Sequence, residues 1–414
     1  MTTKADGQDF GDYATVEDIP PKPTDSEGKP VEGAVPVDPL AALKDSLRAN
    51  TWAAMADKLA ARVVARNDGS EKPVPSPWPT FDKTMGGGLW PGVHFLVGGT
   101  GAGKSQWAIQ VAIKAASEAT PVLYLALELD ELGLFTRGAS FLCGLTEDTH
   151  GTGWERTKWS EFYTGKVKGV PSGVVEALKT LPFHWIVAPP HGWQYAELVA
   201  SVEALRALYP QHVGPVVVVV DFLQLVASGN EREELRERIS RAAYTARAVA
   251  RDADAVVMVL SSTARDGYGK AVVKVGGSKR KGEDSGDAEP QFPEIGELVG
   301  LGKESGDVEY AADSVLVLCP ETYANEDDKP RGSRRMHLAV AKLRAGPPGW
   351  VPLTFDGTRF EEATDTRGAP SSAVPVNVRG AGKKRGTGKR TPKDKALAPM
   401  DPWDSDGATE SDRE

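Results

Sequence analysis

Apolar residues in the middle of the chain come in short continuous runs, and segments with apolar residues at helical spacing lie between several of them. Continuous rather than alternating runs are typical of strands buried on both faces of a sheet. This pattern predicts an α/β domain over residues 80–362 with a mostly parallel central sheet. The predicted strands are residues 94–98, 122–127, 184–188, 215–221, 255–261, 313–319 and 337–342, and the predicted helices are residues 103–118, 129–144, 194–208 and 232–252.

The segments outside this domain differ in composition. Residues 1–38 are acidic, rich in proline and poor in large apolar side chains, which predicts disorder. Residues 39–66 have apolar positions at helical spacing, which predicts one amphipathic helix that either packs on its own domain or docks on a neighbouring subunit. The Gly, Pro and Ser content of residues 67–79 predicts a linker. Residues 363–414 are first basic and then acidic, which predicts a disordered tail.

Composition narrows the function classes only in part. The net charge of -9 indicates no global affinity for nucleic acid, so any such affinity must come from a local basic patch. Cys143 and Cys319 have apolar neighbours, which predicts two buried thiols rather than a disulfide. The six histidines show no paired spacing typical of a metal site built from protein ligands alone. No signal peptide or membrane-spanning run is apparent, so we expect a soluble, cytoplasmic protein without membrane contact.

A phosphate-binding motif is the most specific feature of the chain. The string GGTGAGKS fits G-x-x-x-x-G-K-S/T, with a predicted strand before it and a predicted helix after it. Backbone amides in such a loop and the helix N-terminus favour anions. Lys104 is expected to reach the β- and γ-phosphates of ATP, and the Ser105 hydroxyl to ligate Mg²⁺. The predicted nucleotide-binding residues of the loop are Gly98, Gly99, Thr100, Gly101, Ala102, Gly103, Lys104 and Ser105.

Two acidic residues follow predicted buried strands. Asp221 ends a run of five valines, and at the carboxyl edge of an open α/β sheet its carboxylate is placed to support Mg²⁺. Glu128 follows another apolar run and is placed to activate the attacking water. Asp130 and Glu131 compete for that role, but acidic residues there favour the start of the next helix.

Together these segments resemble the ATPase domain of bacterial replicative hexameric helicases of DnaB type, over about residues 80–362. The string VVVVVDFLQLV is close to that family's Asp-Tyr-Leu-Gln-Leu signature, and two later segments also match. The resemblance implies a RecA-like P-loop NTPase fold, ATP hydrolysis at the subunit interfaces of a homo-oligomeric, hexameric ring, and action on single-stranded DNA in replication. It also implies a replication initiator or loader as a partner. The two later segments are GKESGDVEYAADSVLVL and HLAVAKLRAGPPGWVPLTFDGTRF.

The resemblance also implies roles for single residues. Glu128 matches the catalytic glutamate, Asp221 the magnesium-supporting aspartate, and Arg137 a nucleotide-contacting arginine. Lys342 and Arg344 match a Lys-x-Arg pair that reaches the γ-phosphate of the neighbouring subunit; the alternative is surface charge at a strand end. An arginine supplied across an interface can raise the hydrolysis rate by about 10³–10⁵.

A DNA-binding loop is implied in the same way. Lys303, Glu304 and Gly306 match the family's loop that follows the single-stranded DNA backbone in the central channel. The basic, Gly-rich stretch 274–286 either lines that channel or forms a surface loop.

Two departures from the family leave other functions open. Ser262 stands where the family usually has a γ-phosphate-sensing glutamine, and residues 1–38 cannot build the family's globular N-terminal domain. One alternative is a recombination ATPase of RecA or RadA type, which also has a Lys-x-Arg pair. The other is a regulatory or loading ATPase that binds DNA without unwinding it, which the serine keeps open. The Leu-Gln-Leu after Asp221 favours the helicase.

Overall fold

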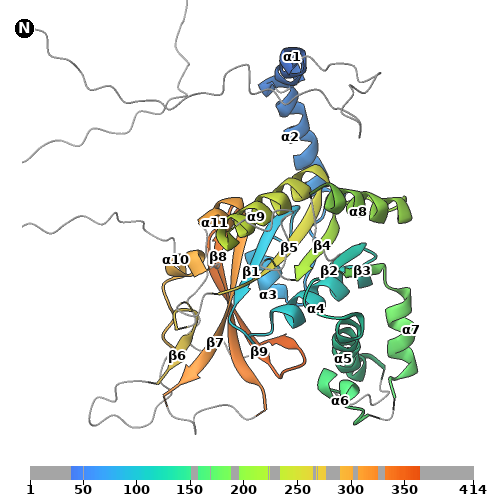
Figure 1. The fold of residues 1–414 in the computed structure, drawn as a ribbon, viewed down its shortest axis with the longest axis vertical. Coiled ribbons are helices and arrows are strands. Elements are labelled where there is room, and N and C mark those ends of the chain that lie inside the picture. Colours follow the sequence, from blue (N-terminus) through green and yellow to red (C-terminus); the bar gives the residue numbers. More distant parts are fainter. Residues whose placement is uncertain are drawn as a thin grey trace, which may run out of the picture. The chain divides into compact units, whose positions relative to one another are not determined.

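The computed structural model describes residues 39–49, 51–150, 157–167, 169–187, 195–221, 223, 234–263, 267, 269–276, 290–301, 306–324 and 332–363. Within them the strands form one sheet in the order β10-β9-β8-β7-β1-β5-β4-β2-β3, with β6 paired to β7 (Figure 1). Neighbours from β7 to β3 are parallel, and β8, β9 and β10 continue the sheet antiparallel. The expectation of a mostly parallel α/β sheet is confirmed.

The strands coincide closely with the apolar runs of the sequence. Their bounds are β1 Gly92–Gly98, β2 Val122–Ala126, β3 Phe183–Val187, β4 Val216–Asp221, β5 Ala255–Ser262, β6 Val273–Val275, β7 Ser314–Tyr323, β8 Arg334–Leu343, β9 Gly349–Phe355 and β10 Phe360–Glu362. The helices of the domain are α3 Pro79–Thr84, α4 Lys104–Ser117, α5 Glu131–His150, α6 Trp159–Tyr163, α7 Ser172–Thr180, α8 Tyr195–Leu208, α9 Leu235–Asp252, α10 Ile295–Leu298 and α11 Gly306–Ala311.

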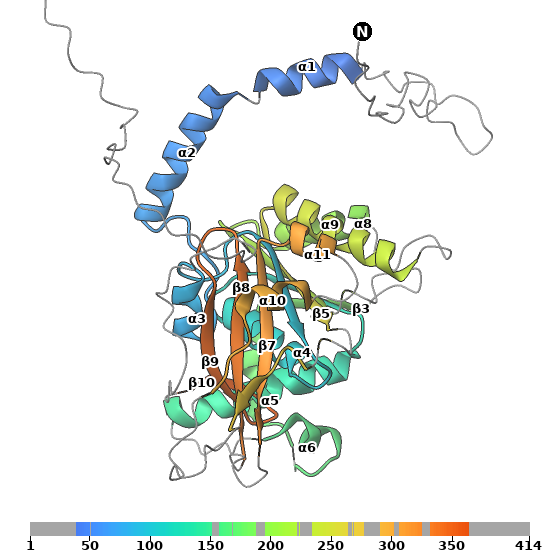
Figure 2. The same ribbon diagram turned by 90° about the vertical axis from the view of Figure 1, so that its left-hand side faces the viewer.

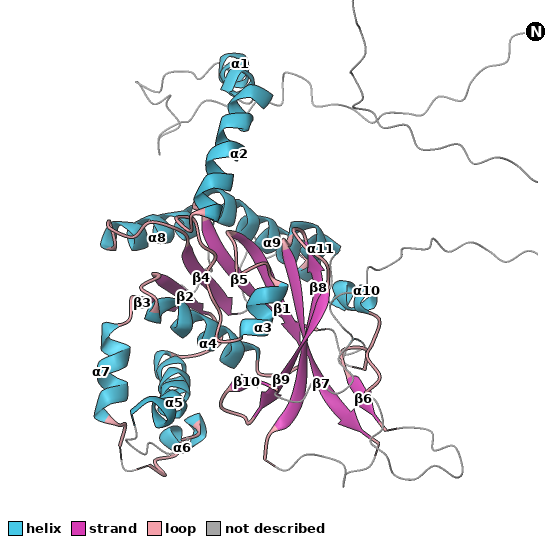
Figure 3. Cartoon of the chain, turned by 180° about the vertical axis from the view of Figure 1, so that it is seen from behind, coloured by secondary structure: helices cyan, strands magenta, loops and turns pink. Residues whose placement is uncertain are grey.

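Helices cover both faces of the sheet, which explains why its strands are apolar throughout (Figure 3). Strand β4 illustrates this arrangement, because successive side chains point to opposite faces. Val217 and Val219 belong to the core that includes residues of α3, α4 and α5. Val216 and Val218 belong to the core that includes residues of α8, α9 and α11.

The segment before the domain forms two helices, α1 Pro39–Ala49 and α2 Trp52–Asn67, where the sequence predicts one over residues 39–66 (Figure 2). Thr51 explains the break. Its backbone is extended, and its side chain accepts a 3.2 Å hydrogen bond from the amide of Ala54 as the N-cap of α2. No side chain of α2 is buried.

The folded domain begins earlier than residue 80. Val74 pairs with Leu89 in an isolated antiparallel bridge, although the composition of residues 67–79 predicts a linker. Trp78 stacks on Trp107 of α4 with ring centroids 4.9 Å apart, and its indole donates a 3.2 Å hydrogen bond to the Phe360 carbonyl. Prolines and serines dominate the composition of this segment, but its few apolar residues belong to the core.

Candidate active site

Four adjacent parallel strands bring the predicted catalytic segments to one edge of the sheet. In the strand register, Gly98 of β1 is the partner of Ser262 of β5, and Ala126 of β2 is the partner of Asp221 of β4. The amide of Leu127 also donates to the Asp221 carbonyl at 2.9 Å. The phosphate loop and both acidic strand ends therefore share the carboxyl edge, where ligands bind in open α/β sheets.

The phosphate loop has the backbone shape that its glycines predict. Gly101 and Gly103 have φ of 72° and 95°, and a Cβ at Gly103 would lie 2.8 Å from the Phe360 ring. The ammonium of Lys104 donates to the carbonyls of Gly98 and Gly99 at 3.0 and 3.2 Å. The lysine is thus folded across its own loop, and α4 begins directly at this residue.

Asp221 is a buried carboxylate with polar partners. Only 1% of the residue is exposed. Tyr124 donates a 2.6 Å hydrogen bond to Oδ2, and Ser105 forms a side-chain hydrogen bond with the same carboxylate. Burial raises the pKa of Asp221, while the hydrogen bonds from Tyr124 and Ser105 and the charge of Lys104 oppose that rise.

The oxygen donors at this edge fit a magnesium ion. Mg²⁺ is usually held by one or two carboxylates with water and substrate phosphates rather than by an all-protein cage. The Asp221 carboxylate and the Ser105 hydroxyl, which already interact, form such a donor pair.

Glu128 lies two residues beyond the end of β2 and is exposed. Its negative charge acts on Asp221, Tyr124 and Arg137, which places it at the same edge. The two competing acidic residues, Asp130 and Glu131, lie at the start of helix α5. Asp130 accepts a 2.6 Å hydrogen bond from the Gly133 amide, and Glu131 is the first residue of α5.

Arg137 projects from α5 and is mostly surrounded by protein. Its guanidinium lies 4.4 Å from the ring centroid of Trp159, in a cation–π contact with α6. Burial lowers the pKa of Arg137, and the charges of Asp221 and Glu128 oppose that change. These charges place Arg137 close to the predicted catalytic residues.

The end of β5 lies directly beside the phosphate loop. Ser262 is the register partner of Gly98, and the amide of Thr263 donates to the Gly98 carbonyl at 3.4 Å. The predicted γ-phosphate-sensing position, Ser262, is therefore adjacent to the phosphate loop.

Lys342 and Arg344 lie at the opposite edge of the sheet. Lys342 is the register partner of Val315 near the start of β7, and the Arg344 guanidinium forms a 3.0 Å salt bridge with Asp313. The seven residues of β1 separate this edge from the phosphate loop by roughly 20 Å. The pair therefore cannot reach the phosphate loop of its own chain.

The predicted DNA-binding loop is only partly within the described residues. Lys303 and Glu304 lie outside them, and Gly306 is the first residue of α11. Helix α11 contacts the basic pair directly: Lys342 donates to the Glu309 carbonyl, and Arg344 to the Tyr310 carbonyl at 3.4 Å.

The sequence pattern did not single out Arg334, which also contacts the phosphate loop. Its guanidinium donates to the Gly101 carbonyl at 2.6 Å and lies 4.9 Å from the ring centroid of Phe355. Burial lowers the pKa of Arg334. A basic residue at the start of a strand carries no local signal of such a contact, because Gly101 precedes it by 233 positions.

Two other expectations concern the rest of the domain. Cys143 and Cys319 are both buried and neither is in a disulfide, as predicted. Among the described helices, none combines the length and apolar character needed to cross a membrane.

Comparison with known proteins identifies the family. A replicative DNA helicase DnaB of Leifsonia xyli subsp. xyli is 27% identical over 303 residues, covering 71% of this chain and 57% of that relative. The DnaB of Geobacillus stearothermophilus is 28% identical over 158 residues, covering 38% and 30%. The chain thus spans less than two thirds of the length of either relative.

Solved structures show the same fold. A DnaB-like replicative helicase, solved in a study of its interactions with primase, has a TM-score of 0.52 at 17% identity, covering 73% of this chain and 65% of that one. A solved ATPase domain has a TM-score of 0.55 at 17% identity, covering 74% and 98%. The family model described as DnaB-like helicase C terminal domain matches residues 74–362, and this chain belongs to that family.

Proposed function

We propose that this protein is an ATP-driven DNA helicase or translocase whose active sites form between adjacent subunits of a ring, with six subunits as in the family's hexamers. The observation that carries the proposal is the separation of two groups of residues. Lys104, Asp221 and Glu128 lie at the carboxyl edge of the sheet, whereas Lys342 and Arg344 lie at the other edge. A complete site then needs the carboxyl edge of one chain and the basic pair of the next.

The side chains at the carboxyl edge support ATP hydrolysis. Lys104 already lies over the loop and would exchange its carbonyl contacts for phosphate oxygens. Glu128 would accept a proton from the attacking water, and Arg137 would contact the nucleotide. Ser105 and Asp221 would hold Mg²⁺, which, when bound, neutralises developing phosphate charge. Arg344 from the adjacent chain would stabilise the transition state, with Lys342 beside it.

Single-stranded DNA is the proposed substrate of the motor. In the sequence, Lys303 and Glu304 lie within three residues of Gly306, the first residue of α11. That helix provides carbonyls contacted by Lys342 and Arg344. A shift of α11 on DNA binding would therefore move the basic pair toward or away from the neighbouring nucleotide. We propose that a replication initiator or loader is a partner of the ring. We also propose that the protein acts in the cytoplasm.

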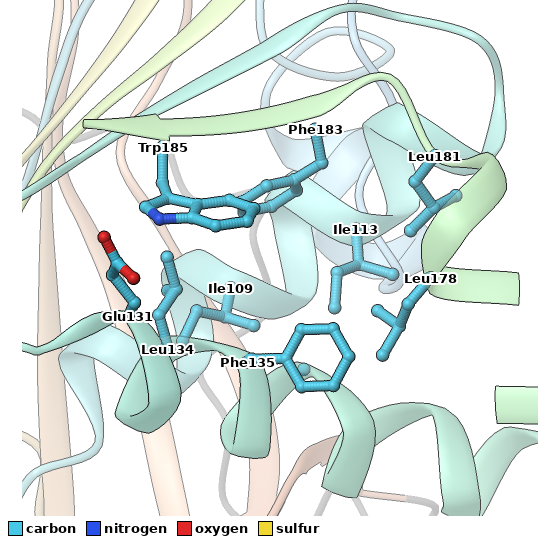
Figure 4. A pocket seen from close by; sticks show the side chains of 10 residues that line it. Ile109, Ile113, Glu131, Leu134, Phe135, Leu178, Leu181, Phe183 and Trp185 are labelled. Carbon is cyan, nitrogen blue, oxygen red and sulfur yellow. The ribbon is translucent and has the colours of Figure 1, made fainter. Parts of the chain in front are cut away.

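Assembly through the N-terminal helices supports the same proposal. Met55, Leu59 and Val63 form an exposed apolar stripe on α2, which also carries basic side chains. An apolar depression with one acidic residue lies between α4, α5, α7 and β3 (Figure 4). We propose that α2 of a neighbouring copy occupies it. The depression is lined by Ile109, Ile113, Glu131, Leu134, Phe135, Gly138, Leu178, Leu181, Phe183 and Trp185.

Strand displacement on a forked DNA duplex tests the function. We expect unwinding with ATP and none with a non-hydrolysable analogue, and Lys104→Ala should abolish both unwinding and ATP turnover. Pairing of homologous strands would instead select a recombination ATPase. DNA binding with neither activity would select a regulatory or loading protein, an alternative that the short Ser262 side chain beside the loop favours.

A further inference from the structure

Tyr124 is a polar residue in an otherwise apolar strand, and the proposed hydrolysis gives it no role. Its ring is fully buried and stacks on Phe183, with centroids 6.1 Å apart. Tyr124 is the register partner of Val219, so Asp221, two residues further along β4, lies on the same face of the sheet. The phenol hydroxyl spans this diagonal and donates its 2.6 Å hydrogen bond to Oδ2 of Asp221.

This hydrogen bond restricts rotation of the Asp221 carboxylate. A buried strand position next to Leu123 and Leu125 needs only an apolar side chain for packing, so the hydroxyl is an additional feature. A carboxylate has two oxygens, and a donor on Oδ2 leaves Oδ1 available to other partners. Rotation of the Asp221 carboxylate would break a short hydrogen bond to a charged group between two buried side chains.

We propose that Tyr124 is a positioning residue of the magnesium–nucleotide site, which holds the Asp221 carboxylate in the orientation that receives the metal. Tyr124 touches neither nucleotide nor metal and acts only through Asp221. The inference rests on the proposed role of Asp221 in supporting Mg²⁺. Tyr124 of β2 would hold the Asp221 carboxylate in one orientation even when no nucleotide is bound.

Tyr124→Phe tests this inference, because it keeps the ring and removes only the hydroxyl. Binding of a fluorescent ADP is measured with Mg²⁺ and again with EDTA. We expect affinity with Mg²⁺ to fall about tenfold, the effect of losing one hydrogen bond to a charged group, and affinity with EDTA to stay unchanged. In steady-state ATP hydrolysis the Mg²⁺ concentration for half-maximal rate should rise, while kcat at saturating Mg²⁺ is retained.

Tyr209→Phe is the matched control, since it removes a hydroxyl that bonds His184 at 2.8 Å, remote from Asp221. Equal losses with Mg²⁺ and EDTA in Tyr124→Phe, with a lowered Tm, would indicate packing alone and overturn the inference. Wild-type Mg²⁺-dependent binding would overturn it too. Asp221→Asn separates the two proposals: if that variant also binds Mg²⁺–ADP normally, the proposed metal site itself is wrong.

Discussion

At the scale of single residues, burial shifts the pKa values of acidic groups, and the sequence does not reveal which groups are affected. Asp82 of α3 accepts hydrogen bonds from the Ser76 amide at 3.0 and 3.1 Å, yet burial raises its pKa to about 6. The charge of Lys114 lowers this pKa and that of Glu362 raises it. Nothing in the string PTFDKT indicates that its aspartate is only partly solvated.

The raised pKa of Asp82 predicts a pH dependence of stability. Between about pH 4 and pH 6 the folded protein binds more protons at this site than the unfolded chain, so stability falls as pH rises through that window. Asp82→Asn mimics the protonated form. Relative to wild type, it should be stabilising by about 0.3–0.7 kcal/mol at pH 4.5 and by about 1–2 kcal/mol at pH 7.5, allowing for partial exposure.

Thermal unfolding at both pH values measures the effect of Asp82→Asn. Asp68→Asn is the control, because hydrogen bonds from Ser70 lower the pKa of Asp68. The charged Asp68 carboxylate stabilises the folded protein at pH values above its unfolded pKa. Asp68→Asn should therefore lower Tm at pH 7.5, whereas Asp82→Asn should raise it. A shift in Tm for Asp82→Asn that is equal at pH 4.5 and pH 7.5 would contradict the prediction.

At the scale of elements, continuous apolar runs made the parallel strands predictable to within a few residues. A run such as Val216–Val220 has no polar position that allows one face to meet water, so it fits only the centre of a layered fold. Short elements were missed, because α6, α7 and β6 lack enough residues for a period to appear. The break at Thr51 was missed because apolar periodicity continues across it, although threonine is a common N-cap.

Contacts distant in sequence explain what was missed in the candidate site. The phosphate loop and the two acidic strand ends were predictable, since strand, glycines and helix follow one another along the chain. The contacts of Tyr124 with Asp221 and of Arg334 with Gly101 join residues 97 and 233 positions apart. A tyrosine within a buried run does carry one signal, because its hydroxyl needs a partner.

Helix α2 gives a prediction about assembly. Leu59→Glu should lower the oligomeric state at micromolar protein without unfolding the single chain, since this side chain is 65% exposed and no side chain of α2 is buried. Ala61→Glu is the control because it lies on the opposite side of the same helix. Sedimentation velocity measures the oligomer, and a wild-type size distribution for Leu59→Glu would exclude the apolar stripe of α2 from the interface.

At the scale of the whole molecule, the two proposed groups of site residues lie on opposite edges of one sheet. The proposed interface would be heterologous, because one surface of each chain would meet a different surface of the next, and such interfaces close into rings when the rotation permits. Each chain would then contribute half of two sites, so hydrolysis would depend on assembly.

Subunit mixing tests this division. Arg344→Ala and Glu128→Gln proteins should each be nearly inactive alone, yet an equal mixture should restore about one quarter of the sites, if subunits mix at random in the ring. The control mixture combines Glu128→Gln with Lys104→Ala. Both substitutions damage the carboxyl edge, so no site in that mixture is intact and no activity should be restored. Absence of recovery at every ratio in the first mixture, measured as ATP turnover, would argue against action across the interface.

The contacts of helix α4 have a consequence for how other segments can be joined to this domain. Trp78, near the first residue of the family match, and Phe360, near its last, meet over Trp107 and Gln110 of this helix. The two ends of the fold are therefore neighbours. A circular permutation that connects them by a short linker should preserve the fold, and any module fused at either end would emerge beside the helix that starts at the phosphate loop.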